Sequence, residues 1–469
     1  MTPWNPLNHL SRFLEGGLER LNLGPAGGRL ARGVFWSLTG GVCSRVLLLT
    51  GSVLVTRLLG AKDFGVLSVV QNTAGMFGTL ALFGLGVTAT KYVAEFRDSD
   101  PTKAGRIIVL CSVMSWMTGA LAGALLALFA PWVAAGVFGV PEATEQVRIA
   151  GLLAVMFSAN SAQLGVLSGF EAFKLAAWTG VATSAVGLPC LVLGAWFWSL
   201  DGAVWGMVTG SVATTALQYW AVRRTMRRAK VTAPSLFGDW WRERAILWRF
   251  SLPVVLCGVA TLPASWLSTA ILAQTRGGLR ELGLYNALHQ WRMLVLYFPT
   301  QVSNGLAPVL AHLHGQGDRL QIRRLLRQAL GWATAPAAVA AAGILVMSPW
   351  ILQLYGDEFR GLTALLGLLM LLGILGAVSL VLQSALNALG KSWWLFWAML
   401  LYGASVLCFT WLQAHWGAVG FALAQLEAAL LFFGLLACLL GWRALAAGPR
   451  SCGVTVLASA TGNGGPSIP

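Results

Sequence analysis

The chain has 469 residues, of which 57% are hydrophobic and only 10% are charged, and its mean hydropathy is +0.71. This composition excludes an assembly of soluble domains and is typical of a polytopic membrane protein. The formal net charge of +15 at pH 7 then has to reflect either nucleic-acid binding or membrane topology.

The first 30 residues are predicted to form an amphipathic segment that lies in the cytoplasmic membrane interface. Leucines recur there on one helical stripe, at Leu7, Leu10, Leu14, Leu18 and Leu21. The first apolar run follows Arg29 and Arg32 without a cleavage-site pattern, so we expect it to remain as the first membrane span.

Twelve apolar segments follow, each long enough to cross a hydrocarbon core about 30 Å thick as a helix. The first six make a predicted N-terminal bundle, 31–222, and the last six a C-terminal bundle, 249–442. A basic linker, 223–248, joins them, and 443–469 has the composition of a disordered tail. The predicted spans lie near residues 33–56, 65–89, 106–130, 148–169, 175–198, 203–222, 249–273, 283–308, 328–350, 361–387, 394–413 and 417–440.

The basic residues are distributed unevenly between the two sides of this topology. With the N-terminus in the cytoplasm, the segments on that side carry 24 Lys and Arg residues and the opposite loops carry six. This bias follows the positive-inside rule and predicts a cytoplasmic (inner) membrane protein with both termini in the cytoplasm. Orientation therefore explains the net charge, and we expect no nucleic-acid partner.

The two predicted bundles look like copies of each other at an offset of 218 residues. The hexapeptide GAKDFG at 60–65 faces GLRELG at 278–283, and Pro131-Trp132 faces Pro349-Trp350. An even number of spans per half gives both copies the same orientation, so their pseudo-two-fold axis should run along the membrane normal. The expected fold is all-α: twelve transmembrane helices in two six-helix bundles around a central cavity.

Two arginines, Arg45 and Arg292, lie inside predicted spans, and their counterparts in the other half are Pro263 and Ala74. A charge at the centre of a membrane helix costs about 2.5 to 3.5 kcal/mol on insertion scales, so both must face protein or water. Either they bind an anionic cargo, or they clamp helices by pairing with a helix-end carbonyl or with Glu427.

The other intramembrane polar residues leave two interpretations open. Glu427 either carries a coupling proton or neutralises an arginine while the cavity is empty, or it belongs to a static ion pair or is a protonated packing residue. Gln71 and Asn72 in the second span match His289 and Gln290 in the eighth. These four side chains either contact the hydroxyl groups of a sugar or form ordinary interhelical hydrogen bonds.

Motifs for catalysis, cofactors or metals are weak. The tripeptide GKS at 390–392 lacks the first glycine of a phosphate loop, where Ala385 stands, and no strand precedes it. His312 and His314 form a lone HxH without neighbouring carboxylates or thiolates. We therefore predict a protein that is not an enzyme and has no cofactor or metal site, with a membrane glycosyltransferase or polymerase as the alternative.

Three stretches carry a family resemblance: FWSLTGGVCSRVLLLTGSVLVTRLLGAKDFGVLSVVQ, LFGLGVTATKYVAEFRDSDPTKAGRI and LGVLSGFEAFKLAAW. In this order they resemble bacterial polysaccharide flippases of the multidrug, oligosaccharidyl-lipid and polysaccharide exporter superfamily. The resemblance implies an alternating-access cavity lined largely by spans 1, 2, 7 and 8. It also implies translocation of a polyprenyl-pyrophosphate-linked oligosaccharide to the outer leaflet for polysaccharide biosynthesis, with membrane lipids, polymerases and glycosyltransferases as partners.

Two related activities remain as alternatives. The segment SRVL resembles the first span of lipid II flippases, and Arg45 matches a functional arginine there, but Gly51 stands where those proteins have another arginine. Ion-coupled multidrug exporters generally carry an acidic residue in the first bundle, and spans 1 to 6 have none deep in the bilayer. Both departures favour a lipid-linked oligosaccharide over lipid II or a cationic drug.

Overall fold

The computed structural model describes residues 24–82, 84–232, 239–244, 246, 262–316 and 319–446. Within these ranges the chain forms helices joined by short connections and contains no strand, which confirms the all-helical prediction for this part of the chain. Most of the predicted amphipathic segment and of the predicted tail lies outside the described residues. The elements in chain order are α2 (Gly24–Ala81), α3 (Leu85–Phe96), α4 (Pro101–Pro131), η1 (Trp132–Val137), η2 (Pro141–Ala143), α5 (Thr144–Gly169), α6 (Phe173–Arg228), η3 (Asp239–Arg244), α8 (Leu262–Ala273), α9 (Gly278–Gln316), α10 (Arg319–Val346), α11 (Ser348–Tyr355), η5 (Asp357–Phe359), α12 (Thr363–Ala388), α13 (Ser392–Gln413), η6 (Ala414–Trp416) and α14 (Gly417–Ala446).

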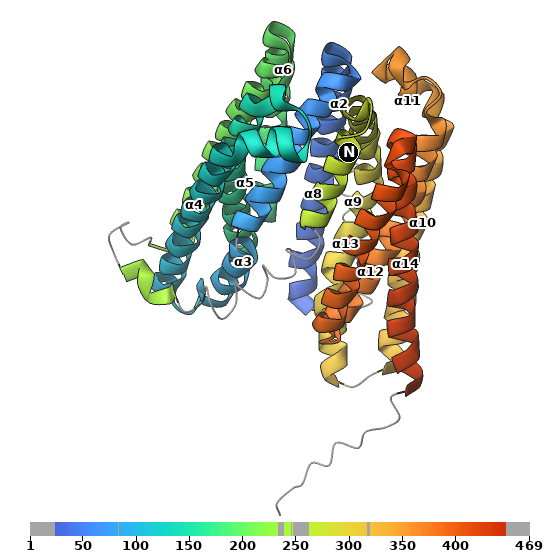
Figure 1. The fold of residues 1–469 in the computed structure, drawn as a ribbon. Helices are drawn as coiled ribbons and strands as arrows, with labels where there is room; N and C mark the ends of the chain where they lie inside the picture. Colours follow the sequence, from blue (N-terminus) through green and yellow to red (C-terminus); the bar gives the residue numbers. More distant parts are fainter. Residues whose placement is uncertain are drawn as a thin grey trace, which may run out of the picture.

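Two of these helices are too long to be straight membrane spans. α2 has 58 residues and α6 has 56, so each would extend more than about 80 Å if straight, whereas a bilayer core measures about 30 Å. The backbone leaves the helical conformation at Gly60 in α2, with φ 76°, and at Ser199 in α6, with φ 48°. The chain reverses at both places, so each helix consists of two arms (Figure 1).

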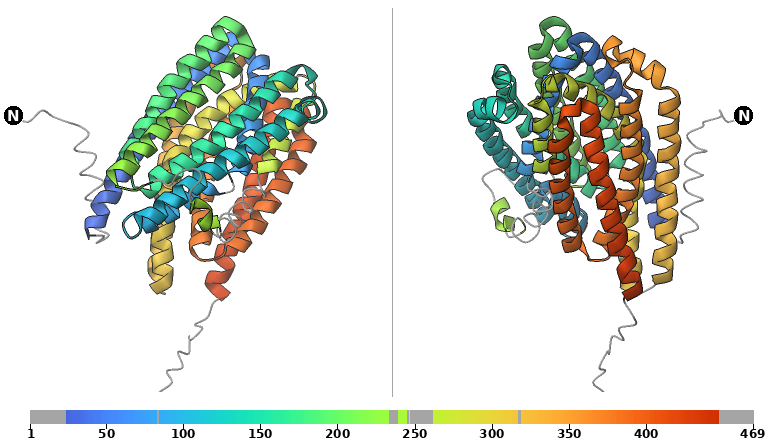
Figure 2. Two further views of the ribbon diagram at one scale, coloured as in Figure 1. Left: turned by 90° about the vertical axis from the view of Figure 1, so that its left-hand side faces the viewer. Right: turned by 45° about the vertical axis from the view of Figure 1, so that its right-hand side comes forward.

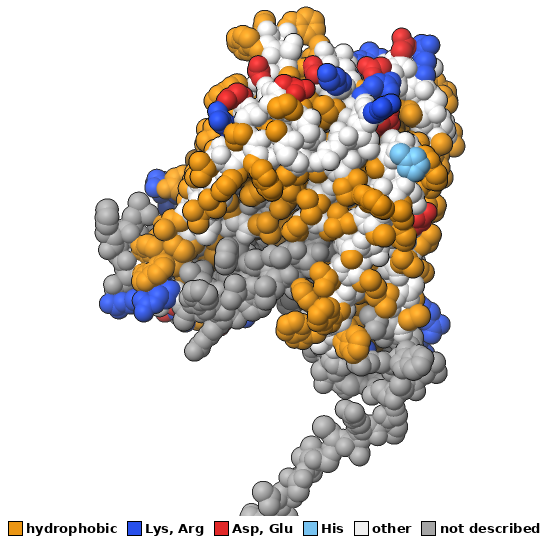
Figure 3. All heavy atoms as spheres, in the orientation of Figure 1, with side chains coloured by type: hydrophobic (Ala, Val, Ile, Leu, Met, Phe, Trp, Pro, Cys, Tyr) orange, Lys and Arg blue, Asp and Glu red, His pale blue; other side chains and the backbone are white. Residues whose placement is uncertain are grey.

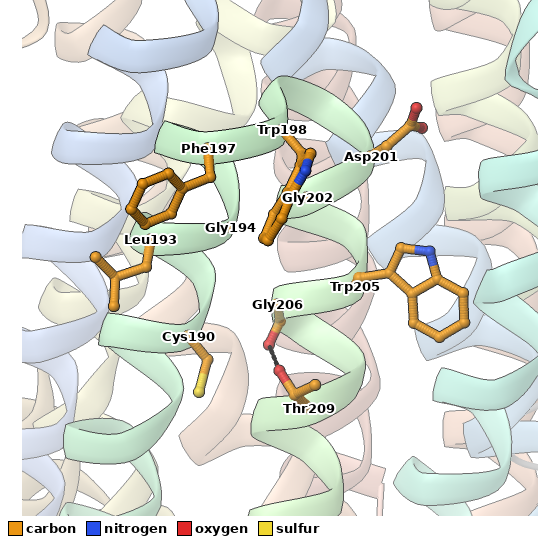
Figure 4. Close-up of a pocket in the computed structure, with 10 residues that line it drawn as sticks. All are labelled: Cys190, Leu193, Gly194, Phe197, Trp198, Asp201, Gly202, Trp205, Gly206 and Thr209. Carbon is orange, nitrogen blue, oxygen red and sulfur yellow. Dashed lines mark hydrogen bonds between the residues drawn. The ribbon is translucent and has the colours of Figure 1, made fainter.

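The arms of α6 pack backbone against backbone. A Cβ atom on Gly194 would overlap the carbonyl oxygen of Gly202, and a Cβ on Gly202 would overlap the carbonyl oxygen of Gly194. Figure 4 shows the two arms side by side with these glycines between them. Small residues let membrane helices approach this closely, so α6 is a tight helical hairpin.

Seven helical runs in the described residues are long and apolar enough to cross a membrane. Three of them contain two predicted spans each, because the chain turns inside the run. Helices α8 and α9, which are not among the seven, coincide with part of the seventh predicted span and with the eighth. The count of twelve spans therefore stays a prediction. The seven runs are Thr39–Ala81, Pro101–Val137, Pro141–Gly169, Phe173–Arg228, Leu320–Val346, Thr363–Ala388 and Trp393–Cys438.

The helices form two groups with α2 between them. Helices α3 to α6 make one group and α8 to α14 the other, and α2 contacts α5 and α6 on one side and α9 on the other (Figures 1 and 2). The groups converge at the upper end of Figure 1 and diverge toward its lower end. On the face shown in Figure 3, hydrophobic side chains cover the middle and charged side chains gather toward the ends.

The two groups meet where α2 crosses α9. A Cβ atom on Gly65 would overlap the carbonyl oxygen of Leu279, and a Cβ on Gly283 would overlap the carbonyl oxygen of Ala61. The two contacts are equivalent in the repeat, because the offset of 218 residues relates Gly65 to Gly283 and Ala61 to Leu279. A single apolar core surrounds the crossing and includes residues from both groups, among them Leu67, Leu153, Leu282 and Leu366.

We expect Gly65→Ala to destabilise the protein by about 1 to 3 kcal/mol, because the added methyl group forces two backbones apart. The matched control is Gly75→Ala in the same arm, where a Cβ atom would have no neighbour within 4 Å. Thermal unfolding of the purified variants in detergent measures the difference. Equal unfolding midpoints for both variants would show that the crossing tolerates separation.

Candidate functional site

A cavity of about 410 Å³ lies between the first arm of α2 and helices α9, α12, α13 and α14. Both arginines predicted to lie inside spans line it, one from each half of the chain. The cavity is otherwise lined by aliphatic residues, hydroxyl groups and amides. Its largest polar side chains are Arg45, Arg292, Tyr297, Gln301, Gln383 and Tyr402.

The packing of α2 against α9 brings the two arginines to the same level. A Cβ atom on Gly41 would overlap the hydroxyl group of Tyr297, so the two helices touch at this point. The first arm of α2 and α9 run in opposite directions, so Arg45, four residues after Gly41, and Arg292, five residues before Tyr297, are displaced the same way. The shift is about 6 Å along α2 and about 7.5 Å along α9.

Neither guanidinium is neutralised by a carboxylate among the described residues. The side chain of Arg45 is half-buried and makes no hydrogen bond to a described residue. Arg292 Nη1 donates to Gln425 Oε1 at 3.5 Å, and its buried Nε has no partner in the described part of the chain. The cavity therefore presents two permanent positive charges with unused donors, as binding a polyanion requires.

A buried polar network on the side away from the cavity fixes the position of Arg292. Tyr285 Oη donates to the same Gln425 Oε1, at 2.9 Å, and lies 3.4 Å from His289 Nδ1. The rings of Tyr285 and His289 stack with their centres 5.5 Å apart. Residues 285, 289 and 292 share one face of α9 because they are spaced one helical turn apart, so this face fixes the position of the guanidinium.

The four predicted sugar-contacting residues do not line this cavity. Gln71 Nε2 donates to Met207 Sδ at 3.5 Å, toward α6, and His289 belongs to the network behind Arg292. Asn72 and Gln290 are half-buried and form no hydrogen bond to a described residue. The structure brings the two arginines together but leaves these four residues elsewhere, so their contact with a sugar stays a prediction.

Glu427 is separated from the arginines in this conformation. Its Oε2 accepts a hydrogen bond from Gln413 Nε2 at 2.7 Å, and it forms no ion pair with Arg45 or Arg292. It lies two positions after Gln425 on α14, which places it about 200° further around the helix, away from the side that holds Arg292. Of the two clamp partners that the sequence suggested for the arginines, a helix-end carbonyl and Glu427, the pair with Glu427 is not formed here.

Sequence reasoning did not identify the uncharged polar lining of the cavity. On α9, Tyr297, Thr300 and Gln301 continue the helical stripe that starts at Arg292 and Met293. Following that stripe with a period of 3.6 residues would have found them. Gln383 and Tyr402 lie on α12 and α13 and carry no charge or motif that distinguishes them in the sequence.

A second hollow, of about 650 Å³, lies on the α6 hairpin and is unlike the arginine cavity (Figure 4). It is lined mainly by apolar and aromatic side chains, including Phe197, Trp198 and Trp205, all of which are exposed. Aromatic residues in such positions are typical of the boundary between a membrane and water. None of its described lining residues is a cation, so we do not assign an anionic ligand to it.

Comparison with known proteins identifies the family. Residues 30–314 match the family described as polysaccharide biosynthesis protein, and residues 256–409 match the MatE family. The chain belongs to the polysaccharide biosynthesis protein family. This confirms the superfamily resemblance drawn from the sequence and a membrane transporter involved in polysaccharide biosynthesis.

The relatives of this polysaccharide biosynthesis protein are distant but cover most of it. The EPS I polysaccharide export inner membrane protein EpsE of Ralstonia solanacearum is 22% identical over 403 residues, which is 84% of this chain and 90% of the relative. The lipid III flippase of Escherichia coli (strain K12) is 24% identical over 330 residues, which is 69% of this chain and 75% of the relative.

Solved structures share its fold. An inward-facing multidrug resistance MATE family transporter of the MOP superfamily matches with a TM-score of 0.68 at 16% identity, covering 86% of this chain and 96% of that protein. The lipid II flippase MurJ in an inward closed conformation matches with a TM-score of 0.69 at 14% identity, covering 86% and 87% of the two chains.

We expect Gln425→Leu to destabilise the protein by about 1 to 3 kcal/mol, because it leaves Tyr285 and Arg292 without their shared acceptor in a buried site. The control is Gln383→Leu, which removes an amide from the cavity wall that bonds to no described residue. Chemical unfolding of both variants in detergent provides the measurement. A larger loss of unfolding free energy for Gln383→Leu than for Gln425→Leu would contradict the network of Tyr285, Arg292 and Gln425.

Proposed function

We propose that this protein is a flippase that moves a polyprenyl-pyrophosphate-linked oligosaccharide from the cytoplasmic to the outer leaflet by alternating access. The observation that carries this proposal is the pair of unneutralised guanidiniums, Arg45 and Arg292, in one cavity between the two halves. Of all parts of such a cargo, the charged pyrophosphate has the highest free-energy cost of leaving water. Two arginines offer it planar, bidentate hydrogen-bond donors in a low-dielectric cavity.

The proposed topology has twelve spans in two six-helix bundles, with both termini in the cytoplasm. In it the crossing of Gly65 and Gly283 lies at the outer end. Two further contacts join the halves at that end: Arg57 Nη2 donates to the carbonyl oxygen of Gln353 at 2.9 Å, and Gln274 Nε2 donates to that of Val137 at 2.7 Å. The described helices separate toward the other end (Figure 1), so we assign this conformation to the inward-facing part of the cycle.

The names of the relatives support a saccharide cargo, since one exports a polysaccharide and another flips lipid III. The cavity itself argues against a cationic drug, because the two charged side chains among its described lining residues are both positive. Gly51 stands where lipid II flippases have a second arginine, and this difference favours another lipid-linked saccharide.

We expect Arg45→Ala or Arg292→Ala to slow translocation about tenfold or more, leaving the linked oligosaccharide on the cytoplasmic side, because each removes charge-assisted hydrogen bonds to pyrophosphate. Arg45→Lys should restore only part of the rate, since an ammonium keeps the charge without the bidentate geometry. The measurement is the leaflet distribution of the linked oligosaccharide in cells with matched protein levels.

The control for these variants is Arg148→Ala, which removes an exposed arginine that pairs with Glu145 far from the cavity. It should translocate normally. If Arg45→Ala and Arg292→Ala also translocate normally, both arginines serve helix packing and do not bind the cargo. Efflux of a cationic drug that persists in these variants would instead support the multidrug alternative.

Glu427 is the proposed coupling group, and Glu427→Gln tests it. The amide keeps the size of the side chain and removes its ability to carry a proton. We expect translocation by reconstituted protein to lose its stimulation by an imposed pH gradient while the basal rate is kept. A variant that responds to the gradient like the wild type would leave Glu427 as a packing partner of Gln413.

A further inference from the structure

A third pocket lies at the open ends of the α6 hairpin, away from the arginine cavity. It has a volume of about 650 Å³ and is formed where the first arm of α6 begins and the second arm ends. Its wall combines cations with indole rings, and the part of it that the structure describes has a single carboxylate. The residues that matter here are Glu171, Lys174, Trp178, Trp220, Arg224 and Arg228.

The spacing of these residues is the same on both arms. On the first arm Lys174 precedes Trp178 by four residues, and on the second arm Arg224 follows Trp220 by four residues. Because the arms run in opposite directions, each tryptophan lies one helical turn, about 6 Å, further into the membrane than its cation. The two indoles thus occupy one level and the cations occupy the next level outward.

The indoles are exposed, with 63% of Trp178 and 47% of Trp220 accessible. Exposed indoles favour the level of the glycerol and carbonyl groups of a lipid, and cations one turn further out lie at the level of its phosphate. The guanidinium of Arg224 lies 5.1 Å from the centre of the Trp220 ring, which ties the two levels together.

The charge of the pocket is positive on balance. Glu171 accepts a hydrogen bond from Arg97 Nη2 at 2.8 Å and is paired with that residue. Neither Arg224 nor Arg228 forms an ion pair with a described carboxylate. The pocket can therefore accept an anion of its own.

We infer that this pocket is a binding site for the headgroup of an anionic phospholipid. The phosphate lies between the cations of the two arms, and the glycerol and ester groups lie against Trp178 and Trp220. The site is separate from the proposed cargo cavity and depends only on the protein being embedded in a membrane.

The test uses full-length protein purified in detergent, with bound lipid counted by native mass spectrometry during titration with phosphatidylglycerol or phosphatidylcholine. We expect the wild type to bind phosphatidylglycerol more tightly than phosphatidylcholine. The double variant Arg224→Gln/Arg228→Gln should bind phosphatidylglycerol about tenfold to thirtyfold more weakly, since each cation near the membrane surface contributes about one kcal/mol.

The chain provides a matched control in Arg223→Gln/Arg227→Gln. These arginines precede the pocket residues by one position each, share their exposure and helix end, and do not line the pocket. Their variant removes the same charge and the same favourable interaction with the helix dipole. It should keep the wild-type preference for phosphatidylglycerol, and its unfolding temperature shows whether either substitution disturbs the fold.

Three results would overturn the inference. Equal weakening by the two double variants would show a general surface-charge effect, and equal affinity of the wild type for the two lipids would show that the pocket does not recognise charge. Displacement of phosphatidylglycerol by equimolar geranyl pyrophosphate or inorganic pyrophosphate would assign the pocket to the cargo or to free anions. Because lipid binding is measured without transport, failure here is distinct from failure of the flippase proposal.

Discussion

The contact between the backbones of α2 and α9 is the constraint on which the rest of the molecule depends. At Gly65 and Gly283 no side chain separates the helices, so each backbone rests on a carbonyl of the other. The same two helices carry the arginines that face the cavity, Arg45 on the first arm of α2 and Arg292 on α9, while α12, α13 and α14 complete its wall. A larger residue at the crossing would therefore change the distance between Arg45 and Arg292 as well as local packing.

Electrostatics explains why the cavity is built around neutral acceptors. A carboxylate beside Arg45 or Arg292 would stabilise the empty protein but would compete with an anionic cargo for the same donors. Gln425 accepts a hydrogen bond from Arg292 without cancelling its charge, and Tyr285 donates to the same amide oxygen and holds it in place. Gln425 and Tyr285 position the guanidinium, and an anionic ligand that entered the cavity would not have to displace them.

The features predictable from the sequence are those set by apolar length and by repetition. Apolar runs placed breaks near Gly60 and Ser199, where the backbone does reverse, and the 218-residue offset paired Gly65 with Gly283 before any contact between them was known. The two arginines stood out because a buried charge is expensive. The resemblance places spans 1 and 8 in the wall of one cavity, where Arg45 and Arg292 do meet, whereas the other described lining residues come from α12, α13 and α14 rather than from the expected spans 2 and 7.

The remaining features depend on the rotation of each helix about its axis, which a uniformly apolar helix does not encode. Gln383 and Tyr402 face the cavity, whereas Asn72 and Gln290 do not line it, and nothing in their sequence context separates the two pairs. Glu427 illustrates the same point, since two residues along α14 decide whether a side chain faces Arg292 or Gln413.

The crossing lies close to the start of α9, so nearly the whole helix extends to one side of it. The helix continues for 33 residues beyond Gly283, or about 50 Å, before it ends at Gln316. A tilt of about 10° at the crossing would move that far end by about 9 Å while displacing the atoms at Gly283 hardly at all. The two halves can therefore open widely at one face of the membrane while the glycine contacts scarcely change. Such a tilt needs no flexible hinge at the crossing.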